Sequence, residues 1–302
     1  QNGDVAAMED RCSHRNVPLS LGRRIEDRIK CPYPGLEFAH TGRCATMPGL
    51  QGAPPEAFSI RRYPVVQRHG FVWIWPGEPA RADESLIVDY SWHDDPAWTG
   101  KIFMRTIKAG YVFNLENLMD LSHVPYVHNA TIAFDSFADA KVTTHVGDAH
   151  VDVRREMRNA SSQSPLTREL GWTRVNTINT VRYRPPSNFQ IHNITENADN
   201  PSERLEARFG APSTPETASS HHHFMTAYRT YALGDAALTE QMADLVLRAF
   251  CEDEVLMTIQ QDRLDRGAYR PEQLFHVDKG AAAAVRMLRK TIDEENKALN
   301  AA

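Results

Sequence analysis

Two short segments near the start of the chain carry side chains that bind metals. Cys12 and His14 lie two residues apart, and Cys31 follows after sixteen further residues. Each segment begins with a cysteine, whose thiolate is a soft ligand suited to iron–sulfur clusters and to zinc. The spacing predicts two loops that hold one metal centre between them. One alternative is a Cys3His zinc site that adds Cys44, since this set of ligands is known to bind zinc. Another is that the loops bind no metal.

A second metal-binding pattern lies between residues 117 and 128, where the carboxylate of Asp120 precedes the imidazoles of His123 and His128. On a regular helix, side chains five positions apart diverge by about 140 degrees. Pro125 lies between the histidines, and proline kinks or ends a helix because it lacks the backbone N–H. We therefore expect the imidazoles to converge. Two histidines and a carboxylate form a facial triad, which leaves open positions on Fe(II) for dioxygen and substrate.

The carboxylate that completes this triad is expected on another element, and a predicted late helix offers three candidates. Glu252, Asp253 and Glu254 follow directly after Cys251. The residue types alone do not choose among them. Charged side chains are rarely buried unless they are paired, so a solvated helix face without a ligand is the alternative.

The elements that position these side chains fall into two regions. From residue 4 to about residue 76, short alternating runs are separated by Gly and Pro, which is typical of a small all-β domain. Residues 78–98 are rich in Pro, Asp and Glu and show no clear period, so we expect a connector that packs on a surface. The predicted domains are therefore residues 1–77 and 99–302, joined by this connector.

The second region is expected to combine strands with helices. A helical stretch over residues 111–128 precedes strand-like segments near residues 141–156, 172–184, 187–195 and 222–232. The internal triplet His221–His223 indicates strand or loop rather than a metal-binding tract. Apolar residues three and four apart predict a long helix over Ala236–Arg266, which Gly267 ends, and a second helix from Ala281 to about Lys297.

Composition and charge exclude several classes of function. The 302 residues include 34 Lys and Arg against 39 Asp and Glu, a net charge of −5, whereas proteins that bind nucleic acid carry a basic excess. No apolar run approaches the ~18 residues of a membrane span, and the first residues are neither a signal peptide nor an initiator Met segment. Four cysteines are too few for a disulfide scaffold. We expect a cytoplasmic protein with neither nucleic acid nor membrane as partner.

Both metal-binding patterns resemble those of one family. The segments Arg11–Arg15 and Cys31–Phe38 resemble the cluster loops of Rieske-type oxygenases. The segment Asn117–His128 resembles the iron site of the Rieske non-heme iron oxygenases, particularly in the vanillate and dicamba O-demethylase branch. The resemblance covers almost the whole chain, although most strands that precede Cys12 in the family are absent. We therefore expect a chain that is N-terminally truncated relative to the family.

The resemblance implies that a Rieske [2Fe-2S] cluster is bound by Cys12, His14 and Cys31. Such a cluster needs two cysteines on one iron and two histidines on the other. Where the family has the second histidine, this chain has Pro34, whose side chain offers no donor atom. The departure puts the assembly and the potential of the cluster in question.

The resemblance also assigns roles around the second pattern. His123 and His128 would bind mononuclear Fe(II), and the third ligand would be Asp253, the Asp of a Glu-Asp pair on the late helix. Asn117 would lie near the iron in a positioning role. Asp120 would pass electrons to the iron from the cluster histidine of a neighbouring subunit in a head-to-tail homotrimer, and that histidine is the one replaced in this chain.

The fold and activity that follow are those of an oxidoreductase. The fold class would be α+β: an all-β Rieske domain, then a helix-grip (START-like) catalytic domain with an antiparallel sheet and long C-terminal helices. A separate reductase or ferredoxin would supply electrons from NADH, and O2 would hydroxylate or O-demethylate a small aromatic compound, such as a vanillate-like aryl methyl ether, in aromatic compound degradation. The alternatives are an electron-dead ligand-binding protein of the same fold, because of Pro34, and a zinc-stabilised binding protein.

Overall fold

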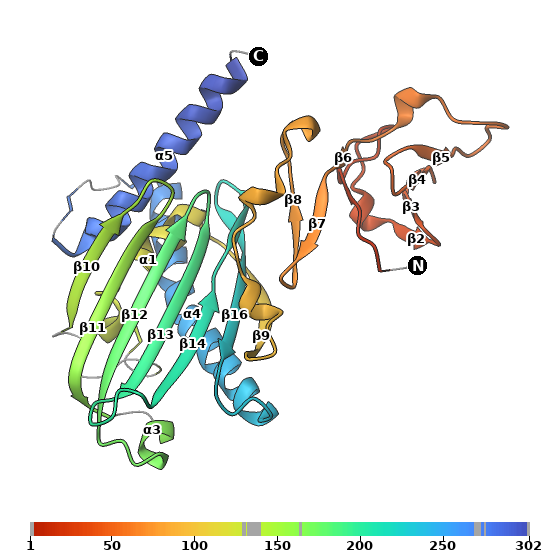
Figure 1. The fold of residues 1–302 in the computed structure, drawn as a ribbon. Helices are drawn as coiled ribbons and strands as arrows, with labels where there is room; N and C mark the ends of the chain where they lie inside the picture. Colours follow the sequence, from red (N-terminus) through yellow and green to blue (C-terminus); the bar gives the residue numbers. More distant parts are fainter. Residues whose placement is uncertain are drawn as a thin grey trace. The chain divides into compact units, whose positions relative to one another are not determined.

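The computed structural model describes residues 3–128, 131, 140–162, 165–268, 273–274 and 276–300 (Figure 1). The chain separates into two compact units, Gln1–Asp89 and Tyr90–Ala302. The division falls inside the segment expected to be a connector. The aromatic end of that segment belongs to the second unit, where the buried Tyr90 hydroxyl donates a hydrogen bond of 3.2 Å to the Phe189 carbonyl.

The first unit is built from short antiparallel strands. Its four-stranded sheet has the order β2 (Arg23–Ile25), β3 (Arg28–Lys30), β4 (Glu37–Ala39), β5 (Cys44–Thr46). Two further pairs are β1 (Ala7–Met8) with β6 (Arg62–Tyr63), and β7 (Val65–Arg68) with β8 (Phe71–Ile74). The 3-10 turns η1 (Leu19–Leu21) and η2 (Glu56–Phe58) lie between these strands, and η3 (Pro79–Arg81) and η4 (Glu84–Leu86) follow β8. The loops before β2 and after β3 place Cys12 and Cys31 in the core of this unit.

An antiparallel sheet of eight strands dominates the second unit. The order is β10-β11-β12-β13-β14-β16-β15, and β9 pairs with β16. The strands are β9 (Thr99–Ile107), β10 (Lys141–Val146), β11 (Val151–Ser161), β12 (Arg174–Arg184), β13 (Asn188–Asn197), β14 (Arg204–Gly210), β15 (Ser213–Thr217) and β16 (Ser220–Arg229). The segment expected as one strand near residues 141–156 is the β10–β11 hairpin, and β9, β14 and β15 are strands that the sequence pattern did not indicate.

Helices pack against the sheet, and Figure 1 shows α1, α4 and the start of α5 behind it. They are α1 (Tyr111–Met119), α2 (Val124–Val127), α3 (Pro165–Glu169), α4 (Ala236–Asp265) and α5 (Lys279–Asn300), with the 3-10 segments η5 (Ser91–His93) and η7 (His276–Asp278). Asp235 caps α4 by accepting a 2.9 Å hydrogen bond from the Leu238 N–H. Gly267 follows the end of α4 with a φ of 80°, a conformation that suits glycine. Both long helices lie where the periodicity predicted them.

The start of α5 approaches the sheet closely because its residues are small. Gly280, Ala281 and Ala284 are buried there. A Cβ on Gly280 would lie 2.2 Å from Cγ2 of Val153 on β11 and 2.9 Å from the Met119 carbonyl oxygen. Glycine is therefore required for the contact between α5, β11 and the end of α1.

The two units together have the predicted α+β class, an all-β unit followed by an antiparallel sheet with long C-terminal helices, which confirms the expected fold. In the part of the chain that is described, no helix is both long enough and apolar enough to cross a membrane.

Candidate metal centre

His123 and His128 converge because they flank one short helix. The helix α1 ends at Met119, and α2 begins with His123 as its N-cap, carries Pro125 in its first turn, and ends with His128 as its C-cap. Proline suits this first turn because the N–H it lacks would have no partner inside the helix. The Nε2 atoms of the two histidines lie 3.2 Å apart. The proline thus starts a new turn rather than kinking a continuous helix.

Asp253 on α4 completes a compact group with the two histidines. Its Oδ1 lies 3.5 Å from His123 Nε2 and 3.3 Å from His128 Nε2. One ligand atom from each of the three residues lies within 4.8 Å of the others, and His128 and Asp253 are buried. Among the described residues, this is the single group of three or more His, Cys, Asp or Glu side chains that is so closely gathered.

The three neighbouring carboxylates on α4 have different partners. Asp253 faces the histidines, whereas Glu252 accepts a 2.7 Å hydrogen bond from Nδ1 of His128. Glu254 forms an ion pair with Arg105 on β9, at 2.9 Å. Residues at successive helix positions point in different directions. The three carboxylates therefore differ in their surroundings: Asp253 faces both histidines, Glu252 contacts one of them, and Glu254 forms an ion pair with β9.

Hydrogen bonds from neighbouring residues fix the orientation of each donor. Nδ1 of His123 donates to the Asp120 carbonyl, and Nδ1 of His128 donates to Glu252, so both Nε2 atoms are left for a metal. The side-chain amide of Asn117 on α1 donates to Oδ1 of Asp253 over 2.8 Å. A positioning role was expected for Asn117, whereas the role of Glu252 as a hydrogen-bond partner was not predicted. The signal for that role is that a histidine that binds a metal needs an acceptor at its second ring nitrogen.

The side chain of Asp120 does not join the group. Its Oδ1 accepts hydrogen bonds from the Ser122 N–H at 2.7 Å and from the Ser122 hydroxyl at 2.5 Å. The carboxylate is half-buried, and only the Asp120 main-chain carbonyl touches His123. Nearby, the buried Arg155 guanidinium donates to the Leu121 carbonyl. Burial lowers the pKa of Arg155 to about 10, and the Asp120 charge opposes that shift.

Charge at the centre is unevenly distributed between the two histidines. Burial lowers the pKa of His123, although the Asp253 carboxylate opposes the shift. For His128 burial also lowers the pKa, but hydrogen bonds and charge from Asp253 and Glu252 outweigh it, so the net shift is upward. A metal ion must displace a proton wherever His128 is protonated, since imidazole binds metals in its neutral form. The two imidazoles and one carboxylate are the donor set of a facial triad for Fe(II), and the residues fit that ion.

The cysteines of the first unit are brought together, but their loops do not supply four cluster ligands. Cys12 and Cys31 are buried in one core. Burial raises the pKa of the Cys31 thiol, and the adjacent Cys12 thiol adds to the shift. His14 and Pro34 lie at the exposed surface of the loops. The two thiols fit one iron of a [2Fe-2S] cluster, whereas the second iron would have His14 alone, so the residues present do not fit the complete cluster.

Cys44 does not turn these loops into a zinc site. Its thiol lies in the same core and contacts the Thr46 carbonyl at 3.5 Å. A zinc ion would gather four donors at 2.0–2.3 Å from itself, within one tetrahedron. In the described parts of the chain, no three ligand atoms of Cys12, His14, Cys31 and Cys44 come that close together. The zinc alternative is therefore not favoured.

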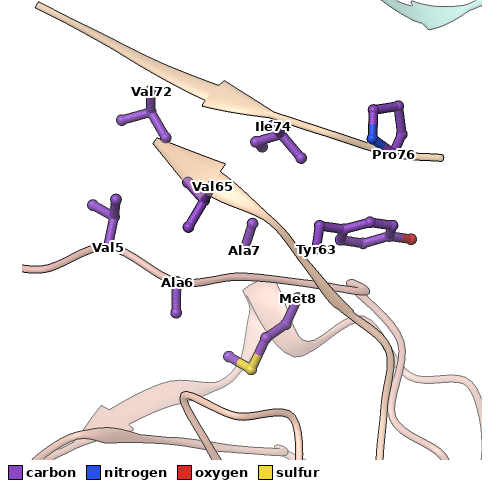
Figure 2. Close-up of a pocket in the computed structure, with 9 residues that line it drawn as sticks. All are labelled: Val5, Ala6, Ala7, Met8, Tyr63, Val65, Val72, Ile74 and Pro76. Atoms are coloured by element: carbon purple, nitrogen blue, oxygen red, sulfur yellow. The ribbon is translucent and has the colours of Figure 1, made fainter. Parts of the chain in front are cut away.

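A cavity of about 470 Å³ lies in the first unit between the strand pairs β1–β6 and β7–β8 (Figure 2). Its lining residues are Val5, Ala6, Ala7, Met8, Tyr63, Val65, Val72, Ile74 and Pro76. This lining is apolar apart from one tyrosine hydroxyl, and it contains no cysteine, histidine or carboxylate. The cavity thus has no metal-binding or acid–base chemistry.

Comparison with known proteins places both units in described families. Residues 1–64 match the Rieske [2Fe-2S] domain, and residues 107–294 match the vanillate O-demethylase oxygenase C-terminal domain. The iron-sulfur subunit of a toluene-4-sulfonate monooxygenase system from Comamonas testosteroni is 32% identical, over 97% of this chain and 88% of that protein. A vanillate O-demethylase oxygenase subunit from a Pseudomonas strain is 32% identical, over 97% of this chain and 92% of that protein.

Solved structures give the same result. Dicamba monooxygenase bound to 3,6-dichlorosalicylic acid matches with a TM-score of 0.90 and 29% identity, over 98% of this chain and 89% of the other. The same enzyme with non-heme iron and dicamba matches with a TM-score of 0.81 and 26% identity, over 98% of this chain and 88% of the other. These findings confirm the family inferred from the sequence motifs. The chain belongs to the Rieske non-heme iron oxygenases, as an oxidoreductase of the branch that contains the oxygenase components of the vanillate and dicamba O-demethylases.

Proposed function

We propose that this chain is the oxygenase component of an aromatic monooxygenase and that it hydroxylates or O-demethylates a small aromatic compound. The observation that carries the proposal is the close group formed by His123 and His128, at the two ends of α2, and by Asp253 on α4. Relatives named for vanillate and dicamba O-demethylation support an aryl methyl ether as substrate. A relative named for toluene-4-sulfonate supports a wider range of small aromatic acids.

The residues around the centre hold the donors rather than react themselves. His123, His128 and Asp253 would bind Fe(II), which when bound supplies open positions for the activation of dioxygen. Asn117 keeps Oδ1 of Asp253 in place, and Glu252 keeps His128 in the tautomer with a free Nε2. Burial of His128 and Asp253 excludes water from the side of the centre that faces the protein interior.

We further propose that electrons reach this centre through Asp120 in a homotrimer, from an NADH-dependent reductase or a ferredoxin. Two observations support Asp120 in this role: its carboxylate is half-buried, so it can be reached from outside the chain, and its carbonyl accepts a hydrogen bond from the ligand His123. We assign Cys12, Cys31 and His14 to the cluster that would deliver the electrons. Pro34 leaves that cluster one ligand short.

The experiment that tests the function compares this chain with its Pro34→His variant after anaerobic reconstitution with iron and sulfide. Both proteins are mixed with NADH, a Rieske-oxygenase reductase and a panel of methoxylated aromatic acids, and formaldehyde is measured. We expect formaldehyde from at least one acid with the variant, and none when Asp253→Ala is added to it. A fully reconstituted variant that forms neither formaldehyde nor a hydroxylated product would contradict the proposed function.

A further inference from the structure

Two buried histidines outside the metal centre have nitrogen atoms without a hydrogen-bond partner. His221 and His223 lie on the inward face of β16 and have an exposed fraction of 0%. Among the described residues, neither Nε2 atom has a donor or acceptor within hydrogen-bond distance. Burying an unpaired polar atom destabilises a fold, so such atoms call for an explanation. Neither histidine takes part in the function proposed above.

The partners at the other ring nitrogens fix where the protons lie. Nδ1 of His221 is 2.7 Å from the Ala109 carbonyl, which can only accept, so Nδ1 carries the proton. Nδ1 of His223 is 3.3 Å from the side-chain amide nitrogen of Asn114, which donates, so Nδ1 accepts. Burial lowers the pKa of both rings, for His223 to about 3, and both are therefore neutral near pH 7. It follows that Nε2 of His221 is an acceptor and Nε2 of His223 is a donor.

Both helices of the metal centre connect it to His223. Asn114, which contacts His223, lies one helical turn before Asn117, which bonds Asp253. Phe250 on α4 contacts the His223 ring, with centroids 4.7 Å apart, and lies one turn before Asp253 itself. Side chains three positions apart share a helix face, and one turn is about 5.4 Å long. His223 thus lies about one turn from Asn117 and Asp253, on the same faces of α1 and α4, with His221 beside it.

The two Nε2 atoms, one an acceptor and one a donor, match one kind of chemical group. The rings of His221 and His223 are nearly perpendicular, with centroids 6.1 Å apart. A hydroxyl both accepts and donates hydrogen bonds, so it can pair with a donor and an acceptor together. A carboxylate or sulfonate only accepts, and it would leave the acceptor on His221 facing an anion.

We propose that His221 and His223 form a polar subsite that binds a hydroxyl group of the aromatic substrate and holds the rest of the ring toward the iron ligands. The subsite rests on the proposed oxygenase function, because it presumes an aromatic substrate at the centre. It adds a specificity: substrates with a free phenolic hydroxyl are preferred over their O-methylated analogues. The residues that support it, Asn114 and Ser213, act as positioning residues for His223, whose Nδ1 lies 2.9 Å from the Ser213 hydroxyl.

The test measures binding rather than turnover, on iron-loaded protein under argon. The probes are 4-hydroxy-3-methoxybenzoate and 3,4-dimethoxybenzoate, which differ only in whether one oxygen carries hydrogen or methyl. By calorimetry we expect the hydroxyl compound to bind about tenfold more tightly, since one or two hydrogen bonds are at stake. His223→Phe and His221→Phe should remove this difference, and His223→Gln, which retains a donor, should keep part of it. His222→Phe is the matched control, because His222 lies on the opposite face of β16, bonded to Thr106.

A second measurement does not depend on any ligand. Nitrogen NMR of histidine-labelled protein should show the Nδ1–H tautomer for His221 and the Nε2–H tautomer for His223. Equal binding of the two probes, binding of neither, or the same tautomer at both histidines overturns the subsite. So does a probe preference that survives in folded His221→Phe and His223→Phe proteins. The formaldehyde assay decides the oxygenase function separately, since it does not require a preference between the two probes.

Discussion

The two metal-binding regions of this chain differ in how completely their donors are assembled. At the centre of the second unit, the donor atoms of the three proposed ligands lie within 4.8 Å of one another, and Asn117, Glu252 and the Asp120 carbonyl hold them in place. In the first unit, two thiols share a core while the imidazole side has His14 and a proline. The donors of the second unit's centre are held by packed helices and their hydrogen bonds, whereas those of the first unit lie on two loops, one of which has a proline where the second histidine is expected.

The largest effect is expected from removing a ligand of the complete centre. His123→Ala leaves two donors, so we expect loss of the single mononuclear iron. The affinity of the protein for iron should fall by more than the 10–100-fold that is typical when a residue that only orients a ligand is changed. Anaerobic iron titration of this chain and of the variant measures it. Cys12→Ala is the control, because it alters the first unit and should leave this iron in place. Unchanged iron binding by a folded His123→Ala protein would show that the metal binds elsewhere.

The next effect should come from completing the incomplete region. Pro34→His supplies the missing imidazole, and we expect the reconstituted variant to hold about two sulfides and two additional irons per chain with visible absorption. The chain with Pro34 should hold clearly less sulfide under the same conditions. Pro34→Ala is the matched control, since it removes the proline without adding a donor. Equal sulfide in all three proteins would mean that another residue already serves as the fourth ligand.

These two regions also show what the sequence could and could not predict. The metal-binding residue types, the new turn at Pro125 and the extents of α4 and α5 follow from local patterns. The choice of Asp253 over Glu252 and Glu254 came from the family resemblance, because it depends on which side of α4 meets α2. The strand β14 was missed although Arg204, Glu206 and Arg208 alternate with Leu205, Ala207 and Phe209, which is the period of a half-buried strand. The contact between Asn114 and His223 joins residues 109 positions apart, so no local pattern reveals it.

A smaller effect is expected from a residue that orients a ligand. Glu252→Gln keeps the size of the side chain but replaces the carboxylate that accepts from His128. We expect iron affinity to fall about 10–100-fold, while protein stability changes little. The matched control is Glu254→Gln, because Glu254 pairs with Arg105 rather than with a ligand. Similar losses of iron affinity in both variants would mean that the charge of α4, and not the bond to His128, is responsible.

The smallest effect concerns stability in acid and arises from the polar interior of the second unit. His223 has a pKa of about 3 when folded, against 6.5 for an unperturbed histidine. Between these values the unfolded chain binds a proton that the folded chain does not, so the free energy of unfolding falls as the pH falls. From pH 7 to pH 5 the loss from this residue is about 2 kcal/mol. Within residues 3–89, by contrast, the buried side chains are apolar or cysteine.

Acid should therefore weaken the second unit first. Hydrogen exchange at pH 7 and pH 5, read separately for each unit, measures the difference, with metal-free protein at both pH values. His223→Gln is the control, because glutamine fills the site without titrating and should flatten the pH dependence of the second unit. An identical pH dependence in this variant would mean that folding does not lower the pKa of His223.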